Sequence, residues 1–581
     1  MTAAAALDQL ADDLAAVSFV PGTEAADEVD ALLARARRLL EVKLRLEARR
    51  PADAPPLVVI AGGTNVGKST VFNWVVGDAV ASSSPLARHT KAPTVFVHSA
   101  EVPALQDGAF LPSYRRTTMH DPTDAAQEPS QGITSYFLKT HERDDVRGVV
   151  LVDSPDIDST HAGNRSVAED LLFLADAVVF VATPEKYNDE LCVRYLRQAT
   201  ELEKALVCVL NKGADQEVAR DFREVVVPGL GGKVTVLTLP YVTPKPDPRQ
   251  GDPFRGELQR AVLGPRDAGA ELRRLALRGA AGRLGRDLTR VVARLREELS
   301  ELDRVRSEAS LVLAARRDEY ARFLETQPFF ELDDVFRRVL QDFRIPVLDD
   351  VYDRVRGAVG LLADGLSRVV RGNGATTKTK EEVRAEADRQ KVKELLEAAR
   401  TEVGEVPYLY TGALRAAAPG WIEGLAATPV EETNAQVSAF LASARGETEA
   451  WIEREKQRHV ELLRSHPNKR NLLYAIKAVL QIGSGLLSAY LTAGFGPTDL
   501  LIGAAAERAT KEILERVGGV AYYQTLKTEF VRDRAALLHR VLLEQHAAAP
   551  LLARLPAGVA PERLDRLEAA ALVLGRGEVP A

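Results

Sequence analysis

The sequence predicts an α/β domain with a doubly wound, mostly parallel sheet, joined to a large all-α region of helical bundles. Short apolar runs recur through the first half of the chain, and helix-like stretches separate several of them. These runs are apolar throughout rather than alternating, which suits strands that helices cover on both faces. They are Leu57–Ala61, Thr94–His98, Ile133–Leu138, Gly148–Asp153, Ala177–Ala182, Ala205–Leu210 and Val234–Leu239.

The order of these patterns predicts the domain boundaries. A chain of 581 residues exceeds the roughly 250–300 residues that one hydrophobic core supports. Near-helical leucine spacing in residues 1–50 predicts an N-terminal helix that packs with the helical region, and the proline-rich stretch Pro51–Pro56 ends it. The α/β domain is expected at 51–250. Beyond the loop Thr243–Phe254 the strand-like runs stop, so we expect a helical region at 265–581.

The composition excludes several classes of function. With 76 basic and 83 acidic residues the formal net charge is −7, so no nucleic-acid partner is expected. Two cysteines, Cys192 and Cys208, are too few for a disulfide framework or a zinc site. The acidic N-terminus lacks the basic region of a secretory signal. A cytoplasmic, reducing environment is therefore expected.

A phosphate-binding loop follows the first apolar run. Leu57–Ala61 leads directly into a G-x-x-x-x-G-K-S motif, and a helix-like stretch follows. Glycines let backbone N–H groups wrap round phosphate oxygens, and the helix N-terminus adds a favourable dipole. We expect Lys68 to neutralise the β and γ phosphates and Ser69 to bind Mg²⁺. The expected nucleotide-binding residues here are Gly62, Gly63, Thr64, Asn65, Val66, Gly67, Lys68, Ser69 and Thr70.

Polar residues at the ends of two later strands complete the predicted site. Asp153 ends the run Gly148–Asp153, where its carboxylate can hold Mg²⁺ through water opposite the phosphate loop. Asn211, Lys212 and Asp215 follow the run Ala205–Leu210, at the edge where a base lies in an open α/β sheet. A carboxylate at Asp215 can accept both N–H groups of guanine, which adenine does not offer as a pair. The sequence therefore predicts GTP in preference to ATP.

These motifs, in this order, resemble the dynamin-like and Era-type branch of the P-loop GTPases over about residues 57–245. The resemblance implies hydrolysis of the β–γ phosphoanhydride of GTP with Mg²⁺, release of GDP, and self-association through the G domain. In such proteins a switch threonine precedes a basic residue and a proline. The stretch RHTKAP offers Thr90, with Thr94 as second choice. Thr90 would then close over the γ phosphate and Mg²⁺ as a catalytic and metal-binding residue.

The chain departs from the family pattern at three places. The motif D-x-x-G reads Asp153-Ser154-Pro155-Asp156, so an acid replaces the flexible glycine. The guanine motif N-K-x-D is one residue longer, N-K-G-A-D, and Gly213 could absorb the insertion. Ile157 stands where Ras-like enzymes carry the glutamine that orients the attacking water. The first departure predicts altered switching, and the second leaves the strictness of guanine recognition open.

Asn65 offers a replacement for that glutamine. Era-type GTPases without the glutamine often carry an asparagine at this position, which helps to bind K⁺ beside the phosphates. A monovalent cation there would stabilise charge that develops between the β and γ phosphates, so Asn65 is a candidate catalytic residue. Alternatively, Asn65 only braces the loop through hydrogen bonds. Both interpretations remain open at this point.

A weakly charged segment, 471–517, lies within the helical region. No residue from Ala478 to Thr498 is charged, but glycines and Pro497 interrupt the run, which favours a hairpin of two close-packed helices over one membrane-spanning helix. Either the hairpin contacts membrane lipid, with Lys469, Arg470 and Lys477 near its base, or it is buried in a bundle. The first alternative implies a peripheral membrane protein.

Three functional hypotheses follow. The leading one is a dynamin-like GTPase in which nucleotide state drives the helical region, at a membrane if the hairpin meets lipid. The second is a soluble regulatory GTPase that acts on a protein or ribosomal partner. The third is a nucleotide-binding scaffold with negligible turnover, which Asp156, Ile157 and the lengthened guanine motif favour.

Overall fold

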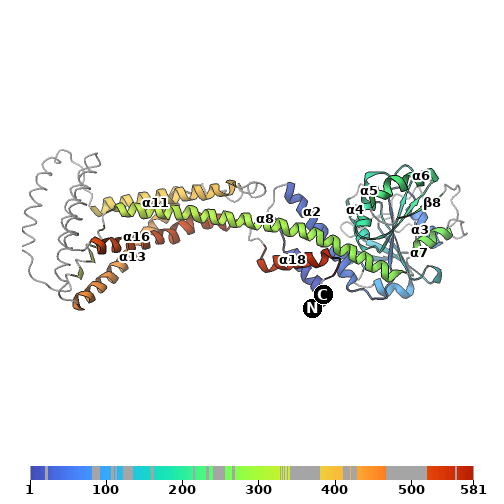
Figure 1. Cartoon of the computed structure of the whole chain (residues 1–581), viewed down its shortest axis with the longest axis horizontal. Coiled ribbons are helices and arrows are strands. Elements are labelled where there is room, and N and C mark those ends of the chain that lie inside the picture. The colour runs from blue at the N-terminus through green and yellow to red at the C-terminus, as the bar shows by residue number, and fades with distance from the viewer. Residues whose placement is uncertain are drawn as a thin grey trace, which may run out of the picture. The chain divides into compact units, whose positions relative to one another are not determined.

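The chain divides into two compact units in the computed structural model (Figure 1). Unit 1 comprises Met1–Phe19, Thr23–Leu299 and Gly558–Ala581, and unit 2 comprises Val20–Gly22 and Ser300–Ala557. The structure describes residues 2–19, 24–81, 92–105, 110–111, 114–121, 135–158, 162–213, 216–230, 234–239, 255–264, 268–327, seven positions from 329 to 339, 380–409, 419, 428–465, 520–555 and 559–579.

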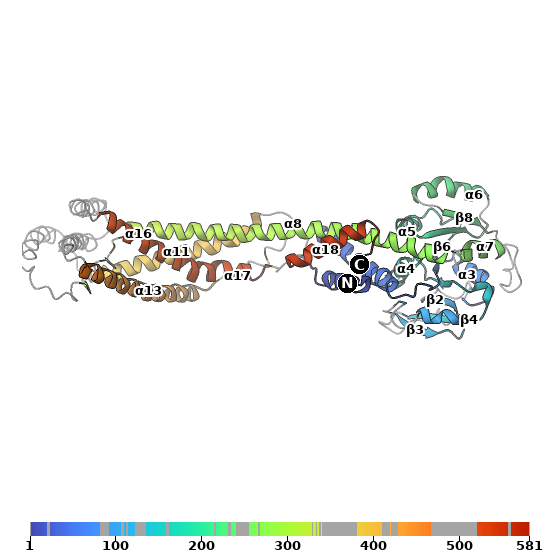
Figure 2. The same cartoon turned by 60° about the horizontal axis from the view of Figure 1, so that its bottom comes forward.

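Unit 1 is built on an eight-stranded sheet of order β3-β4-β2-β5-β1-β6-β7-β8. Every strand pair is parallel except β2 with β5, which is antiparallel. This confirms the predicted mostly parallel sheet, with β1 at its centre and β3 at one edge (Figure 2). The strands are β1 (Leu57–Gly62), β2 (Thr94–His98), β3 (Arg115–Thr118), β4 (Ser135–His141), β5 (Val150–Asp153), β6 (Ala177–Ala182), β7 (Ala205–Leu210) and β8 (Val234–Thr238).

Strand β3 has no counterpart among the predicted apolar runs. Its sequence, RRTT, is polar, and its side chains are exposed or half-buried because it forms the edge of the sheet. An edge strand of this kind packs few apolar side chains, so hydrophobicity does not mark it. The predicted run Ile133–Leu138 is represented by β4, which begins at Ser135 and extends to His141.

Helices cover both faces of the sheet. On one face, α3 (Lys68–Val76) and α7 (Arg255–Leu263) pack against alternate side chains such as Val58 and Ile60 of β1. On the other face, α4 (Ala162–Leu174) and α5 (Glu190–Glu201) pack against Val59 and the side chains in register with it. The central strands β1, β5 and β6 are therefore buried on both sides, which explains their continuous apolar sequences.

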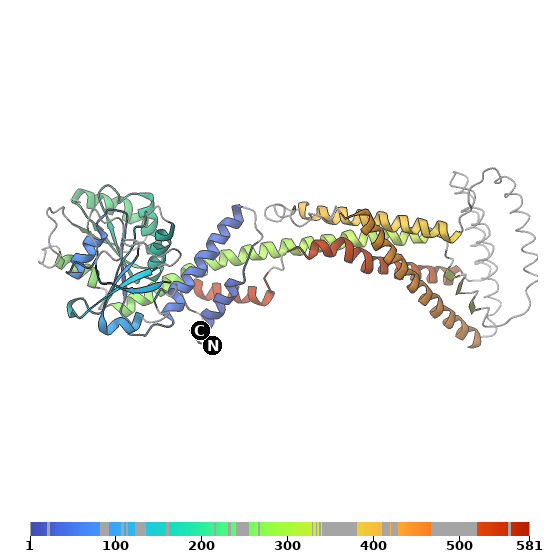
Figure 3. The ribbon, with the colours of Figure 1, turned by 180° about the vertical axis from the view of Figure 1, so that it is seen from behind.

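The two ends of the chain meet in unit 1. The elements involved are α1 (Ala3–Ala15), α2 (Glu24–Leu39), a π-helical segment η1 (Leu40–Arg45), α18 (Pro561–Gly575) and α8 (Gly269–Thr326) up to Leu299. Their apolar side chains join the core on the α4 side of the sheet. Figure 3 shows the two terminal helices α1 and α18 close together. Asp13 of α1 is buried and accepts from Arg563 at 3.2 Å and Arg566 at 2.6 Å. The N-terminal helices thus pack with segments of the predicted helical region.

A buried polar cluster joins η1 to the sheet. Asp176, at the start of β6, pairs with Lys43 of η1 at 2.5 Å and accepts the backbone N–H of Leu57 at 2.8 Å. The Lys43 ammonium also donates to the Leu174 carbonyl at 3.1 Å, at the end of α4. The side-chain nitrogen of Lys204 is also buried, which lowers its pKa well below the ordinary value, and it donates to the carbonyls of Phe173 and Ala175. The two amino groups satisfy carbonyls at the end of α4.

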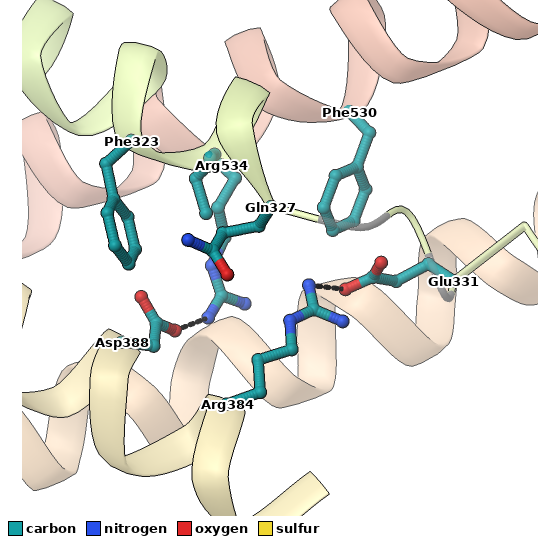
Figure 4. A pocket seen from close by; sticks show the side chains of 8 residues that line it. Phe323, Gln327, Glu331, Arg384, Asp388, Phe530 and Arg534 are labelled. Carbon is teal, nitrogen blue, oxygen red and sulfur yellow. Dashed lines mark hydrogen bonds and ion pairs between the residues drawn. The ribbon is translucent and has the colours of Figure 1, made fainter. Parts of the chain in front are cut away.

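Unit 2 is a helical bundle. Its core is formed by the later part of α8 together with α11 (Lys380–Glu405), α13 (Val430–Ser465), α16 (Val520–Leu537) and the π-helical segment η10 (Leu538–Ala548). The 3₁₀ turn η8 (Val406–Leu409) and α17 (Ala549–Leu552) extend it. A small cavity between these helices is lined by two ion pairs, Arg534 with Asp388 at 3.0 Å and Arg384 with Glu331 at 2.5 Å (Figure 4). The bundle confirms the predicted all-α region.

Within the part of the chain that the structure describes, none of the helices combines the length and apolar character needed to span a bilayer. The segment 471–517, predicted to form the apolar hairpin, lies outside the described residues.

Candidate phosphate-binding site

The phosphate loop follows β1 at the centre of the sheet, and two of its glycines have no room for a side chain. Gly62 has φ 154°, and a Cβ there would lie 2.2 Å from the Val181 carbonyl oxygen. Gly67 has φ 96°, in the left-handed region, and a Cβ would lie 2.4 Å from the Asn211 amide nitrogen. Substitution at either position would displace the loop. The motif glycines are therefore needed to bring the loop against the neighbouring strands β6 and β7.

The predicted guanine-motif residues Asn211 and Lys212 hold the loop from the end of β7. The Asn211 side-chain amide donates to the Val66 carbonyl at 2.9 Å, and the Lys212 ammonium donates to the Asn65 carbonyl. Asn65 has φ 61°, a left-handed conformation that asparagine tolerates better than most residues, and its side chain is exposed. The left-handed backbone therefore favours asparagine at position 65 whether or not the side chain binds K⁺. Gly213, which follows, also has a positive φ of 84°.

Asp153 and Ser69 meet below the loop. The Ser69 hydroxyl, in the first turn of α3, donates to Asp153 Oδ2 at 2.8 Å. Asp153 is fully buried, and its Oδ1 has no hydrogen-bond partner. Burial raises the pKa of Asp153 to about 6, although the positive charge of Lys68 acts in the opposite direction. A buried carboxylate oxygen without a partner, next to a hydroxyl, is the oxygen donor set that Mg²⁺ prefers. These two residues fit the predicted metal.

No cluster of three or more histidine, cysteine or acidic side chains arranged for a metal ion occurs among the described residues. A Mg²⁺ ion at Asp153 and Ser69 would take its other ligands from phosphate oxygens and water, as Mg²⁺ does in nucleotide sites.

Lys68 is buried beneath the loop that it serves. Its ammonium donates to the Gly63 carbonyl at 2.9 Å and forms an ion pair with Asp156. Asp156 is the acid that replaces glycine in the D-x-x-G motif. The side chains are 5% and 9% exposed, so solvent screens this pair little. The departure from the family motif therefore acts directly on the lysine that is predicted to bind phosphate.

Two residues that the sequence analysis did not identify also contact the loop. Asp158 accepts from the backbone N–H and the hydroxyl of Thr64, both at 2.7 Å. The Lys186 ammonium donates to Asp158 at 3.1 Å and to the Thr64 carbonyl at 3.2 Å. Lys186 lies in the turn after β6, the strand beside β1. The adjacency of β1 and β6 was the only signal that could have identified it.

The structure places the remaining predicted residues as follows. Ile157 is buried in the apolar core on the α4 side of the sheet, so its side chain does not face solvent at the loop. Thr70 lies in the first turn of α3. Thr94, the second choice for the switch threonine, begins β2 and is buried in the sheet. Thr90 and Asp215 lie outside the described residues.

Comparison with known proteins finds a matching family and a curated relative. The family described as 50S ribosome-binding GTPase matches residues 57–212. A probable transmembrane GTPase, FZO-like and chloroplastic, of Arabidopsis thaliana is 25% identical over 186 residues. That alignment covers 32% of this chain and 18% of the relative, so the chain spans about a fifth of the relative's length.

Two solved structures also align with the chain. Both come from work on an oligomerised bacterial dynamin pair that provides a mechanism for long-range sensing and tethering of membranes. One is 9% identical, covers 98% of this chain and 94% of its own, and has a TM-score of 0.43. The other is 12% identical, covers 96% and 95%, and has a TM-score of 0.40.

The family match begins at the first residue of β1 and ends at Lys212, so it includes the phosphate loop, Asp153 and the first two guanine-motif residues. Residues 57–212 therefore resemble a P-loop GTPase domain, and a helical region follows them, which confirms the predicted resemblance to the dynamin-like and Era-type GTPases.

Proposed function

We propose that this chain binds GTP with Mg²⁺, hydrolyses its β–γ phosphoanhydride and uses the change of nucleotide state to move its helical region at a membrane surface. The observation that carries the proposal is the convergence of Lys68, Ser69 and Asp153 at the carboxyl ends of β1 and β5. Such residues hold triphosphate and metal in P-loop enzymes. Membrane action is supported by the FZO-like relative, whose name describes a transmembrane GTPase.

The residues have distinct parts in this mechanism. The loop from Gly62 to Gly67 presents backbone N–H groups to phosphate oxygens, and Lys68 supplies the positive charge for the β and γ phosphates. Ser69 and Asp153 would hold Mg²⁺, which neutralises charge on the β and γ oxygens when bound. Thr90 is proposed to close over the γ phosphate. Catalysis in this scheme is positioning and electrostatic stabilisation, because phosphoryl transfer leaves little covalent chemistry to the protein.

A nucleotide-binding protein with negligible turnover is the second candidate. Ile157 is buried, so its position supplies no side chain to orient water, and Asp156 engages the phosphate-binding lysine. The buried Ile157 weakens the case for hydrolysis and leaves the case for nucleotide binding unchanged. A turnover number measured at saturating GTP separates the two candidates.

The decisive experiment measures phosphate release from GTP with and without liposomes that contain anionic lipid. The proposal expects slow basal turnover that rises on liposomes, and specific activity that rises with protein concentration if the G domains self-associate. Turnover that responds to neither lipid nor concentration would favour a soluble regulatory GTPase. Absence of turnover with intact GTP binding would favour the scaffold.

Guanine recognition is tested at Asp215. We expect GTP to bind more tightly than ATP, because the Asp215 carboxylate accepts two N–H groups of guanine. Loss of hydrogen bonds to a charged acceptor costs about 1.5–3 kcal/mol each, so Asp215→Asn should weaken GTP binding at least about tenfold. Xanthosine triphosphate, whose base offers a complementary carbonyl to the new amide, should recover part of the loss. Equal affinity of the unmodified protein for ATP and GTP would contradict the assignment.

The proposed K⁺ site is tested at Asn65. We expect turnover to rise when K⁺ replaces Na⁺ at equal ionic strength, because Ile157 provides no water-orienting group. Asn65→Gly removes the amide and keeps the left-handed backbone, so it separates cation binding from loop geometry better than Asn65→Ala. The variant should lose the K⁺ response and keep its nucleotide affinity. Identical rates in both salts would leave Asn65 with a backbone role alone.

A further inference from the structure

The Asp156 carboxylate pairs with the Lys68 ammonium, which is the group that a nucleotide phosphate is expected to contact. Phosphate oxygens are the expected partners of a P-loop lysine. In the structure the Lys68 ammonium contacts the Asp156 carboxylate and the Gly63 carbonyl. Asp156 is buried, and it lies three residues after Asp153, on the segment that leaves β5. Its carboxylate therefore takes the place of a phosphate oxygen on this lysine.

A second acid on the same segment occupies the loop backbone. Asp158 accepts the N–H of Thr64 at 2.7 Å, so a backbone donor of the phosphate loop is already used. Partial burial opposes ionisation of Asp158, but the hydrogen bonds from Thr64 and the Lys186 ammonium keep its pKa below the ordinary value. Asp158 is therefore an anion held against the loop. Asp156 and Asp158 flank the buried Ile157, which fixes the segment between them to the core.

We propose that Asp156 and Asp158 form an internal anionic latch that competes with nucleotide phosphates for the phosphate loop and so sets its affinity for guanine nucleotides. The inference rests on the proposed function, because it concerns the same site. A triphosphate and the latch cannot occupy Lys68 together, since like charges in a buried site repel strongly. Nucleotide entry requires the segment 156–158 to move away from the loop. The two acids are thus determinants of nucleotide affinity that a D-x-x-G motif lacks.

The latch stabilises the empty form, so its removal has two linked consequences. Asp156→Asn leaves the Lys68 charge without its carboxylate, which raises the free energy of the empty form. In the nucleotide complex Lys68 contacts phosphate both in the unmodified protein and in Asp156→Asn. The substitution therefore changes the free energy of the complex less than that of the nucleotide-free protein. The variant should therefore have a lower melting temperature without nucleotide and a tighter nucleotide complex.

The test compares Asp156→Asn, Asp156→Gly and Asp158→Asn with the unmodified full chain. Binding of fluorescent GDP and GTP is measured by stopped flow and equilibrium titration, and melting is measured with and without nucleotide. We expect Asp156→Asn to tighten the dissociation constant on the order of tenfold, chiefly through faster association. Asp156→Gly should act in the same direction, and Asp158→Asn less strongly because that acid is more exposed.

A matched control is Glu185→Gln, which removes an exposed negative charge from the turn that carries Lys186. It should leave the dissociation constants within about twofold of the unmodified protein, because exposed charges are screened.

Equal or weaker GTP binding in Asp156→Asn, with GTP binding still saturable, would overturn the latch. Failure of the proposed function has a different signature, namely no saturable GTP binding by any of the proteins. If a variant unfolds at too low a temperature for titration, the rise in melting temperature on addition of nucleotide is measured instead. A rise in Asp156→Asn that is no larger than in the unmodified protein would also contradict the latch.

Discussion

Lys68→Ala is expected to abolish measurable triphosphate binding, whatever the base. The substitution removes the counter-charge for the β and γ phosphates and also leaves the buried Asp156 carboxylate without its cation. Truncating one partner of a buried charged pair costs about 2–5 kcal/mol, which corresponds to at least about thirtyfold in the dissociation constant. Repulsion between Asp156 and the incoming phosphates adds to this loss. Equilibrium titration with fluorescent GTP measures the effect.

Two further variants separate the causes of that loss. Lys139→Ala removes a lysine from β4, which β2 and β5 separate from β1, and should leave GTP binding unchanged. Lys68→Ala combined with Asp156→Asn should recover part of the affinity, because the unpaired carboxylate is gone. Tight GTP binding by Lys68→Ala alone would discredit the phosphate-loop assignment altogether.

Much of the α/β architecture was predictable because buried parallel strands have a simple sequence signature. The runs Thr94–His98, Ala177–Ala182 and Ala205–Leu210 coincide with β2, β6 and β7, since all three pack apolar side chains on the sheet. Strand order was not predictable from such runs. Neither was β3, whose polar residues face solvent at the sheet edge.

The candidate site was predictable where a motif is local and was missed where the fold brings distant residues together. The phosphate loop and Asp153 follow from strand ends and glycine spacing within one stretch of sequence each. Lys186 lies 122 residues from Thr64 along the chain, and only the pairing of β1 with β6 brings it to the loop. Asp156 was recognised as a departure, but its partner could not be known, because an ion pair depends on where the segment after β5 turns.

The buried cluster at Asp176 shows the same dependence on tertiary structure. Lys43 and Asp176 are both fully buried, and the Arg50 guanidinium lies 3.6 Å from the same carboxylate. Two cations keep the pKa of Asp176 below its ordinary value although burial opposes ionisation. Asp176 also accepts the N–H of Leu57, the first residue of β1. One carboxylate therefore joins the N-terminal helical layer to the strand that leads into the phosphate loop.

Asp176→Ala is consequently expected to destabilise unit 1 by about 3–5 kcal/mol. It removes the anion closest to buried Lys43, so that Glu47 is the remaining acid beside Lys43 and Arg50, and it leaves the Leu57 N–H without the Asp176 acceptor. Hydrogen exchange of peptides from β1 and α4 in the full chain measures the loss locally, since a chain of two units need not unfold in one step. The control is Glu203→Gln, which breaks a largely exposed ion pair with Arg278 in the same unit and should cost at most about 1 kcal/mol. Unchanged protection of β1 in Asp176→Ala would mean that the cluster does not hold η1 to the sheet. The expected result is a loss of protection in η1, β1 and the end of α4, with unit 2 peptides unaffected. GTP binding should weaken as well, because the phosphate loop begins where β1 ends.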